Sequence, residues 1–110
     1  MKNRYFQSLY SIHSSLENIE NYFGTDKNFE KYDSMLQHAV ERNLEIIGEA
    51  IKRIFELDPN VPIASSRAII NTRNKIAHSY DEIENTQIWE ILVNHLPILK
   101  KEVFKLLNEN

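Results

Sequence analysis

Apolar residues recur every three or four positions along most of the chain, the spacing that lines one face of an α-helix. The first such stripe runs over about residues 2–23, and Gly24 directly after it is typical of a helix end. A second, longer stripe runs over about residues 27–57, with Asp26 placed to cap it. Its inner positions are Phe29, Tyr32, Leu36, Val40, Leu44, Ile47, Ile51, Ile54 and Phe55.

A helix breaker follows at "DPNVP", residues 58–62, whose two prolines lack the N–H that a continuing helix needs. Ser65 or Ser66 can then cap a third, shorter helix, which we expect to end near His78. The inner face of that helix carries Ala68, Ile69, Thr72 and Ile76.

The last apolar stripe begins after Asn85 or Thr86, either of which can cap a helix. Pro97 lies inside this stripe and predicts a kink, or two abutting helices, at His95 and Leu96. The inner positions are Ile88, Ile91, Leu92, Leu96, Leu99, Val103 and Leu106. Four to five helices joined by short loops predict an all-α fold, an antiparallel up-and-down bundle.

Composition sets further bounds on the protein. A length of 110 residues with 42% hydrophobic residues fits a single helical domain over residues 1–110. The absence of cysteine excludes disulfides and thiolate metal sites. The net charge of -3, from 13 basic and 16 acidic residues, argues against coating nucleic acid through bulk charge. No apolar run is long enough for a signal peptide or a membrane span, so we expect a cytoplasmic protein.

Gly48 stands inside the second predicted helix, within "EIIGEAIK". A glycine in an exposed helix interior costs about 1 kcal/mol relative to alanine. Its presence predicts a close approach by a neighbouring helix.

The stretch "TRNKIAHSYDEIE", residues 72–84, concentrates polar side chains that can do chemistry. At 100° per residue, Arg73 and His78 are about 140° apart around a helix, whereas Asn74 and His78 share a face. A site that uses both Arg73 and His78 should therefore lie at a helix end. It could also be shared with another element or another copy of the chain.

These groups suit phosphodiester cleavage. A histidine such as His78 can give or take a proton near neutral pH, and Arg73 can hold a phosphate with two hydrogen bonds. In RNA the neighbouring 2′-hydroxyl can be the nucleophile, so that no metal is required. Asn74 could orient the histidine or a phosphate oxygen, and Tyr80 could bind a phosphate or stack on a base.

A purely structural interpretation fits the same residues. A cation near a helix C-terminus interacts favourably with the helix dipole, and His78 could serve that purpose alone. Arg73 and Lys75 could pair with Glu82 or Glu84 on the surface.

Three segments resemble HepT-like proteins of the HEPN superfamily. "RNKIAHSY" fits the R-x4-H-x-Y signature, with Arg73, His78 and Tyr80 at its three fixed positions. "QHAVERNLEIIGEAIKRI", residues 37–54, is similar to the long second helix of that family. "IWEILVNHLPILKKEV", residues 88–103, is similar to its last segment.

The resemblance implies an all-α HEPN-like fold and a metal-independent endoribonuclease toxin of a type VII toxin–antitoxin pair, without a cofactor. Arg73 and His78 would be the catalytic pair that cleaves RNA, with tRNA as one candidate, in a cleft between the subunits of a homodimer. An MntA-like minimal nucleotidyltransferase would neutralise the toxin by transferring AMP to Tyr80. The alternative is a non-catalytic HEPN module that binds a nucleotide or recruits this nucleotidyltransferase.

Other residues carry weaker expectations. Glu49 could face the cleft and orient Arg73, or form an ordinary salt bridge. Arg42 and Asn43 could line the cleft or be a surface pair.

The remaining histidines and aromatic residues have simpler interpretations. The three histidines outside the motif lack metal-ligand spacing, so no metal site is expected. The larger aromatic residues are expected in the core, with a partner surface as the alternative for the N-terminal ones. The histidines are His13, His38 and His95, the core aromatics are Trp89 and Phe104, and the N-terminal aromatics are Tyr5, Phe6 and Tyr10.

Overall fold

The structure is a computed structural model that describes residues 2–23, 34–78 and 85–109, and every regular element in these ranges is helical. This confirms the predicted all-α fold. The predicted stop at Gly24, the cap at Asp26 and the start of the second helix near Lys27 lie outside the described residues. The elements are α1 (Lys2–Phe23), α2 (Ser34–Leu57), α3 (Ser66–His78), α4 (Asn85–Glu90), the π-helical turn η2 (Ile91–His95) and α5 (Leu96–Asn108).

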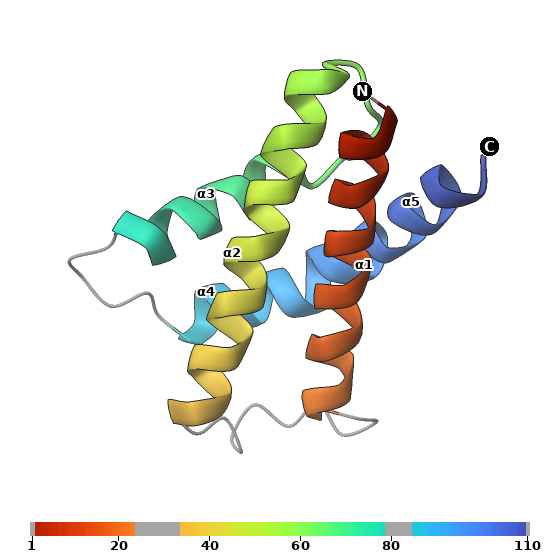
Figure 1. The fold of residues 1–110 in the computed structure, drawn as a ribbon. Coiled ribbons are helices and arrows are strands. Elements are labelled where there is room, and N and C mark those ends of the chain that lie inside the picture. Colours follow the sequence, from red (N-terminus) through yellow and green to blue (C-terminus); the bar gives the residue numbers. More distant parts are fainter. Residues whose placement is uncertain (1, 24–33, 79–84, 110) are drawn as a thin grey trace.

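The two long helices α1 and α2 lie side by side and antiparallel (Figure 1). Helix α3 packs on the side of α2 that faces away from α1. Elements α4, η2 and α5 follow one another along a bent path that crosses the α1–α2 pair, and α5 packs against α1. Helix α2 is therefore the centre of the bundle, because both α1 and α3 rest on it.

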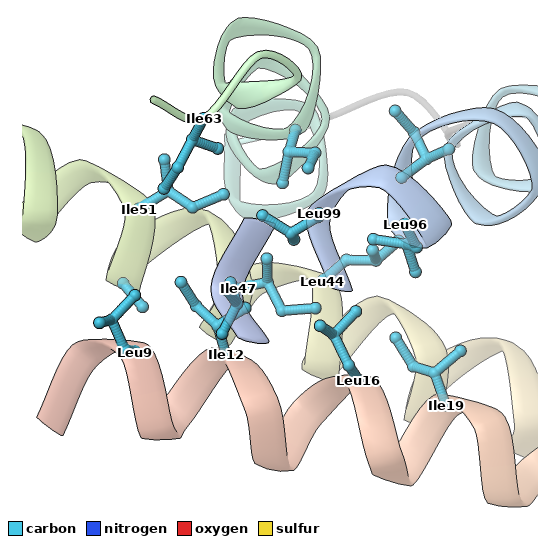
Figure 2. Packing of buried hydrophobic residues seen from close by; sticks show 14 of the residues in the cluster. Leu9, Ile12, Leu16, Ile19, Leu44, Ile47, Ile51, Ile63, Leu96 and Leu99 are labelled. Atoms are coloured by element: carbon cyan, nitrogen blue, oxygen red, sulfur yellow. The ribbon is translucent and has the colours of Figure 1, made fainter. Parts of the chain in front are cut away.

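The core lies between α1, α2 and the run of α4, η2 and α5, which we call the C-terminal path (Figure 2). Each helix contributes the apolar stripe that its sequence predicts, and most of the stripe residues are buried. Partly buried against the core are Tyr5, Leu36, Phe55, Ala68 and Ile76. The predicted inner positions Phe29 and Tyr32 lie outside the described residues. None of the helices within the described residues is both long and apolar enough to cross a membrane. The labelled core residues in Figure 2 are Leu9, Ile12, Leu16 and Ile19 of α1, Leu44, Ile47 and Ile51 of α2, Ile63, and Leu96 and Leu99 of the C-terminal path.

The predicted breaker after α2 is confirmed. Helix α2 ends at Leu57, and the Asp58 side chain accepts a hydrogen bond from the backbone N–H of Asn60 at 3.1 Å, as in a local Asx turn. Val61 and Ile63 are buried and attach this turn to the core. The chain thus reverses direction within a few residues and enters α3 beside α2.

The predicted irregularity before Pro97 is also confirmed, and it takes the form of a π-helical turn. The N–H of Leu96 donates to the carbonyl of Ile91, five residues earlier, and α5 begins with Pro97 near its N-terminus. Proline cannot donate a helical hydrogen bond and its ring crowds the preceding turn. The wider π turn accommodates this without breaking the path of the helix.

Two polar contacts attach the start of α3 to the C-terminal path. The backbone N–H of Ala64 donates to the Glu102 carboxylate at 2.8 Å. The Ser65 hydroxyl and Nδ1 of His95 share a hydrogen bond of 2.9 Å. The carbonyl of Ser65 accepts from the N–H of Ile69, so Ser65 is the N-cap residue that directly precedes α3. These contacts fix where α3 starts before it reaches α2.

Some aromatic predictions are wrong. Phe104 is 65% exposed and Tyr10 is 58% exposed, so neither is a core residue. Both lie on helices whose buried stripes are already filled by aliphatic side chains, which leaves these rings outside. Trp89, by contrast, is partly buried against the core.

Tyr5 and Phe6 match the core prediction. Both pack against the core, and their rings meet edge to face with centroids 5.6 Å apart. Burial, with smaller contributions from the charges of Asp58 and Glu109, raises the pKa of Tyr5.

Replacing Leu44 by alanine tests the position of the core. The Leu44 side chain is fully buried, so Leu44→Ala should lower the free energy of unfolding by about 2–5 kcal/mol, measured by denaturant titration. On the same helix, Met35 is 81% exposed, and Met35→Ala should change the free energy by no more than about 0.5 kcal/mol. Equal losses in the two variants would contradict this packing.

Candidate active site

At Gly48 of α2, helix α3 lies so close that a side chain at this position would collide with it. A methyl group at position 48 would stand 2.7 Å from Cγ of Arg73 and closer still to its Cβ. The carbonyl oxygen of Ile69 would lie 3.6 Å away, an ordinary contact. The predicted close approach at Gly48 is therefore confirmed. The sequence did not indicate that the neighbour is Arg73, because helical spacing describes each helix but not which residues of two helices meet.

The guanidinium group of Arg73 is held at both terminal nitrogens. Nη2 lies 3.1 Å from a carboxylate oxygen of Glu49, in an ion pair between α3 and α2. Nη1 donates to Oδ1 of Asn74 at 3.1 Å. Two residues of the candidate site, Glu49 and Asn74, thus contact Arg73 directly.

The third nitrogen of the guanidinium, Nε of Arg73, is buried and has no hydrogen-bond partner among the residues that the structure describes. A buried donor without a partner costs about 1–3 kcal/mol, and most buried polar groups in proteins have a partner. The Arg73 side chain is 19% exposed and that of Glu49 is 38% exposed. Their ion pair is therefore partly shielded from water, and its charges interact more strongly than those of an exposed pair.

The motif histidine lies at the end of the same helix. His78 is the last residue of α3, which agrees with a site at a helix end. Tyr80 lies outside the described residues, as do Glu82 and Glu84, the surface partners considered for Arg73 and Lys75. The described partner of Arg73 is Glu49.

Asn43 faces α1 and takes no part in the contacts around Arg73. The buried Asn43 side chain accepts a hydrogen bond from Asn18 at 3.2 Å and donates to the Tyr22 hydroxyl and to the Ala39 carbonyl. This network joins α1 to α2. Arg42 is exposed and lies 3.8 Å from Glu45, so the surface-pair interpretation describes it.

The histidines outside the motif are dispersed. Nε2 of His13 lies 2.9 Å from Glu17, His95 bonds Ser65, and His38 is exposed. No group of three or more His, Cys, Asp or Glu side chains in residues 2–23, 34–78 and 85–109 is arranged to hold a metal ion.

An apolar groove of about 510 Å³ lies apart from Arg73. It runs between the C-terminal half of α1 and the α4–η2–α5 path, and the ion pair between Lys100 and Glu20, 2.7 Å long, stands at its edge. The exposed ring of Phe104 forms part of its wall. None of the residues that contact Arg73 lines this groove.

Comparison with known proteins places the chain in a family. The sequence profile described as "Ribonuclease HepT-like" matches residues 12–106, which include α2, α3 and the motif. The chain belongs to the HepT-like ribonuclease family. This confirms the family that the three sequence segments indicated, and the enzyme class at the level of that family.

Individual relatives cover nearly the whole chain. "Probable ribonuclease HepT" of Thermococcus cleftensis is 34% identical over an alignment of 112 positions, which covers 96% of this chain and 98% of the relative. "Putative RNase MJ0125" of Methanocaldococcus jannaschii is 32% identical over 107 residues, covering 92% and 89%. "Putative RNase MJ1380" of the same organism is 35% identical over 101 residues, covering 86% and 89%. No solved structure matches the chain significantly.

Within this HepT-like fold, the packing at Gly48 predicts how a substitution there changes the stability of the protein. Gly48→Ala should lower the free energy of unfolding by about 1–3 kcal/mol, because the added methyl group collides with Arg73. In an Arg73→Gly background the collision is gone. The same Gly48→Ala change should then raise the free energy by up to about 1 kcal/mol, the ordinary gain of alanine over glycine in a helix.

Denaturant titration of the four proteins measures both effects. A loss of similar size in the two backgrounds would mean that Gly48 meets some group other than Arg73.

Proposed function

We propose that this protein is a metal-independent endoribonuclease toxin in which Arg73 and His78 form the catalytic pair. The observation that carries the proposal is the way in which the Arg73 side chain is held. A cation is held in a partly buried place between α2 and α3 by Glu49 and Asn74, and its buried Nε has no partner among the described residues. Five residues later the same helix ends at His78.

This arrangement supports the first requirement of phosphodiester cleavage, a fixed cation that can stabilise developing negative charge. A preorganised donor stabilises the transition state without having to reorganise during the reaction. Glu49 and Asn74 limit the rotamers of Arg73, so little conformational entropy remains to be lost when a phosphate binds. A modest turn of the guanidinium would offer Nε and one terminal nitrogen to a phosphate as a bidentate pair.

Proton transfer supplies the second need. We assign the base to His78, which removes the proton of the ribose 2′-hydroxyl as its oxygen attacks the adjacent phosphorus. The bond from phosphorus to the 5′-oxygen breaks, and an acid protonates that oxygen. The products are a 2′,3′-cyclic phosphate and a 5′-hydroxyl end. Arg73 stabilises the charge on the phosphorane in between.

A homodimer would provide both the base and the acid. Each chain has one motif histidine, and a two-fold axis beside the end of α3 would bring two copies of His78 and Arg73 into one cleft. We therefore place the site at a subunit interface. The position of His78 at a helix end, rather than mid-helix, supports this placement.

Tyr80 is the proposed point of control. An MntA-like minimal nucleotidyltransferase would transfer AMP to its hydroxyl, and Tyr80 is two residues beyond His78 in the sequence. A phosphate-linked adenylate adds negative charge and bulk. Close to Arg73, it would compete with the RNA phosphate and silence the enzyme.

One observation favours the alternative of a non-catalytic module. Both terminal nitrogens of Arg73 already have protein partners, as expected of an arginine that only joins α3 to α2. In that case the chain would recruit a nucleotidyltransferase without cleaving RNA. The variants His78→Ala and Arg73→Ala, tested for RNA cleavage below, separate the two functions.

Purified protein incubated with RNA in EDTA tests the catalytic pair. The wild-type protein should cleave, because no step needs a metal. His78→Ala should lower the rate by about 10²–10⁴-fold through loss of proton transfer. Arg73→Ala should lower it by about 10²–10³-fold through loss of charge stabilisation.

His38→Ala is the matched control, since His38 is an exposed histidine elsewhere on α2 and its loss should leave the rate unchanged. An RNA with 2′-deoxyribose at the cut position should resist cleavage. Equal activity of the wild-type and His78→Ala proteins would refute the assignment.

Intact-mass spectrometry after co-expression with a minimal nucleotidyltransferase tests the modification. The wild-type chain should gain AMP, and Tyr80→Phe should not, because it lacks the accepting hydroxyl. Tyr10→Phe, at an exposed tyrosine on α1, should still be modified. AMP retained on the Tyr80→Phe chain, or absent from the wild type, would rule out Tyr80 as the acceptor.

A further inference from the structure

Helix α3 differs from the other α-helices in its charge. Its sequence, "SRAIINTRNKIAH", holds three basic residues, Arg67, Arg73 and Lys75, and no carboxylate. Each of α1, α2, α4 and α5 contains at least one glutamate, and the whole chain has a net charge of -3. Positive charge is therefore concentrated on the helix that ends at His78.

The exposed side of α3 forms a line of donors. Arg67, Asn71 and Asn74 are all exposed. Their spacing of four and three residues places them within an arc of about 60° around the helix axis. Ile69 and Thr72 lie buried on the opposite side, against the rest of the bundle. We call the three exposed residues the α3 donor face.

Spacing extends this face toward the candidate site. Position 78 follows Asn74 by four residues, one helical turn, and therefore lies on the same side of α3. From Arg67 to position 78 the helix rises about 16 Å, at 1.5 Å per residue. The α3 donor face thus has the length of a few nucleotides and leads to the end of the helix where His78 lies.

The side chains of the face are available to a ligand. Within the described part of the chain, no hydrogen bond or ion pair is found for the side chains of Arg67 and Asn71 of this face. The same holds for Lys75, which lies beside the face. Asn74 uses its oxygen to accept from Arg73, which leaves its N–H donors unused in these ranges. Glu49, the carboxylate that reaches α3, is already paired with Arg73.

We propose that the α3 donor face binds the phosphate backbone of single-stranded RNA and leads it toward the end of α3. Arginine and asparagine are phosphate donors, and contacts of this kind position a strand without reading its bases. No Phe, Tyr or Trp lies on α3 to stack on a base, so the contacts should be tolerant of sequence. This inference rests on the proposed ribonuclease function and adds the path of its substrate.

The test compares Arg67→Gln with Arg4→Gln. Both remove one positive charge at an exposed position, but Arg4 lies on α1, on the other side of α2 (Figure 1). Binding of a fluorescent oligoribonucleotide is measured in a His78→Ala background, so that the RNA stays intact. Arg67→Gln should weaken binding roughly 3- to 10-fold, and Arg4→Gln should leave it nearly unchanged.

The dependence of RNA affinity on salt concentration, and of KM on RNA length, tests whether Arg67 contacts a phosphate. The slope of log affinity against log salt concentration should fall by about 0.7 in Arg67→Gln, the loss of one phosphate contact on a single strand. In the cleaving protein, Arg67→Gln should raise KM for a long RNA, and the effect should shrink as the RNA is shortened.

Several results would overturn the proposal. One is an equal effect of Arg67→Gln and Arg4→Gln on binding, and another is an unchanged salt slope. A third is dissociation of the oligomer by Arg67→Gln in sedimentation, which would make the face a subunit contact.

Failure of the catalytic proposal is distinguishable from these results. Loss of RNA binding in Arg67→Gln, together with a wild-type protein that does not cleave, would support the RNA path and reject the ribonuclease.

Discussion

The contact between α2 and α3 at Gly48 is the constraint on which the candidate site depends. With no side chain at position 48, the stem of Arg73 can lie directly against α2. Its guanidinium then reaches Glu49, the next residue of α2. A larger residue at position 48 would push α3 outward, and both the ion pair and the direction of Arg73 would change. One missing methyl group thus decides where the positive charge of the site is held.

The same contact explains how a cation can sit in a partly buried place. Burying a charge is costly unless a partner compensates for it. Glu49 supplies the opposite charge and Asn74 a hydrogen-bond acceptor, but Nε of Arg73 has no partner within the described ranges. The compensation is therefore incomplete. A phosphate oxygen that accepted a hydrogen bond from Nε would complete it, in keeping with the proposed role of Arg73.

Helix α3 is also constrained at its start, at some distance from Arg73. The Glu102 carboxylate and the His95 ring hold the two residues that precede the helix. His95 belongs to the π-helical turn that accommodates Pro97. The direction in which α3 leaves the bundle thus depends on the C-terminal path as well as on α2. A helix held at its start and at its middle has a defined direction relative to α2.

Much of this protein follows from the sequence by itself. The period of the apolar residues determined the helices and their buried faces, because the spacing that puts apolar side chains on one face of a helix can be read locally. The two prolines of residues 58–62 determined the turn. Gly48 and Pro97 indicated a close approach and an irregular turn, since each residue removes an atom that a regular packed helix would use. The R-x4-H-x-Y motif and two neighbouring segments were sufficient to indicate the family.

Only the tertiary structure decided which residues meet. It paired Arg73 with Glu49 and Gly48, turned Asn43 toward α1, and left Phe104 and Tyr10 exposed where apolar character alone predicted burial. Helical periodicity defines the inner face of each helix, but it does not specify the rotation and height at which two helices pack. Those depend on how the side chains of both helices fill the same space.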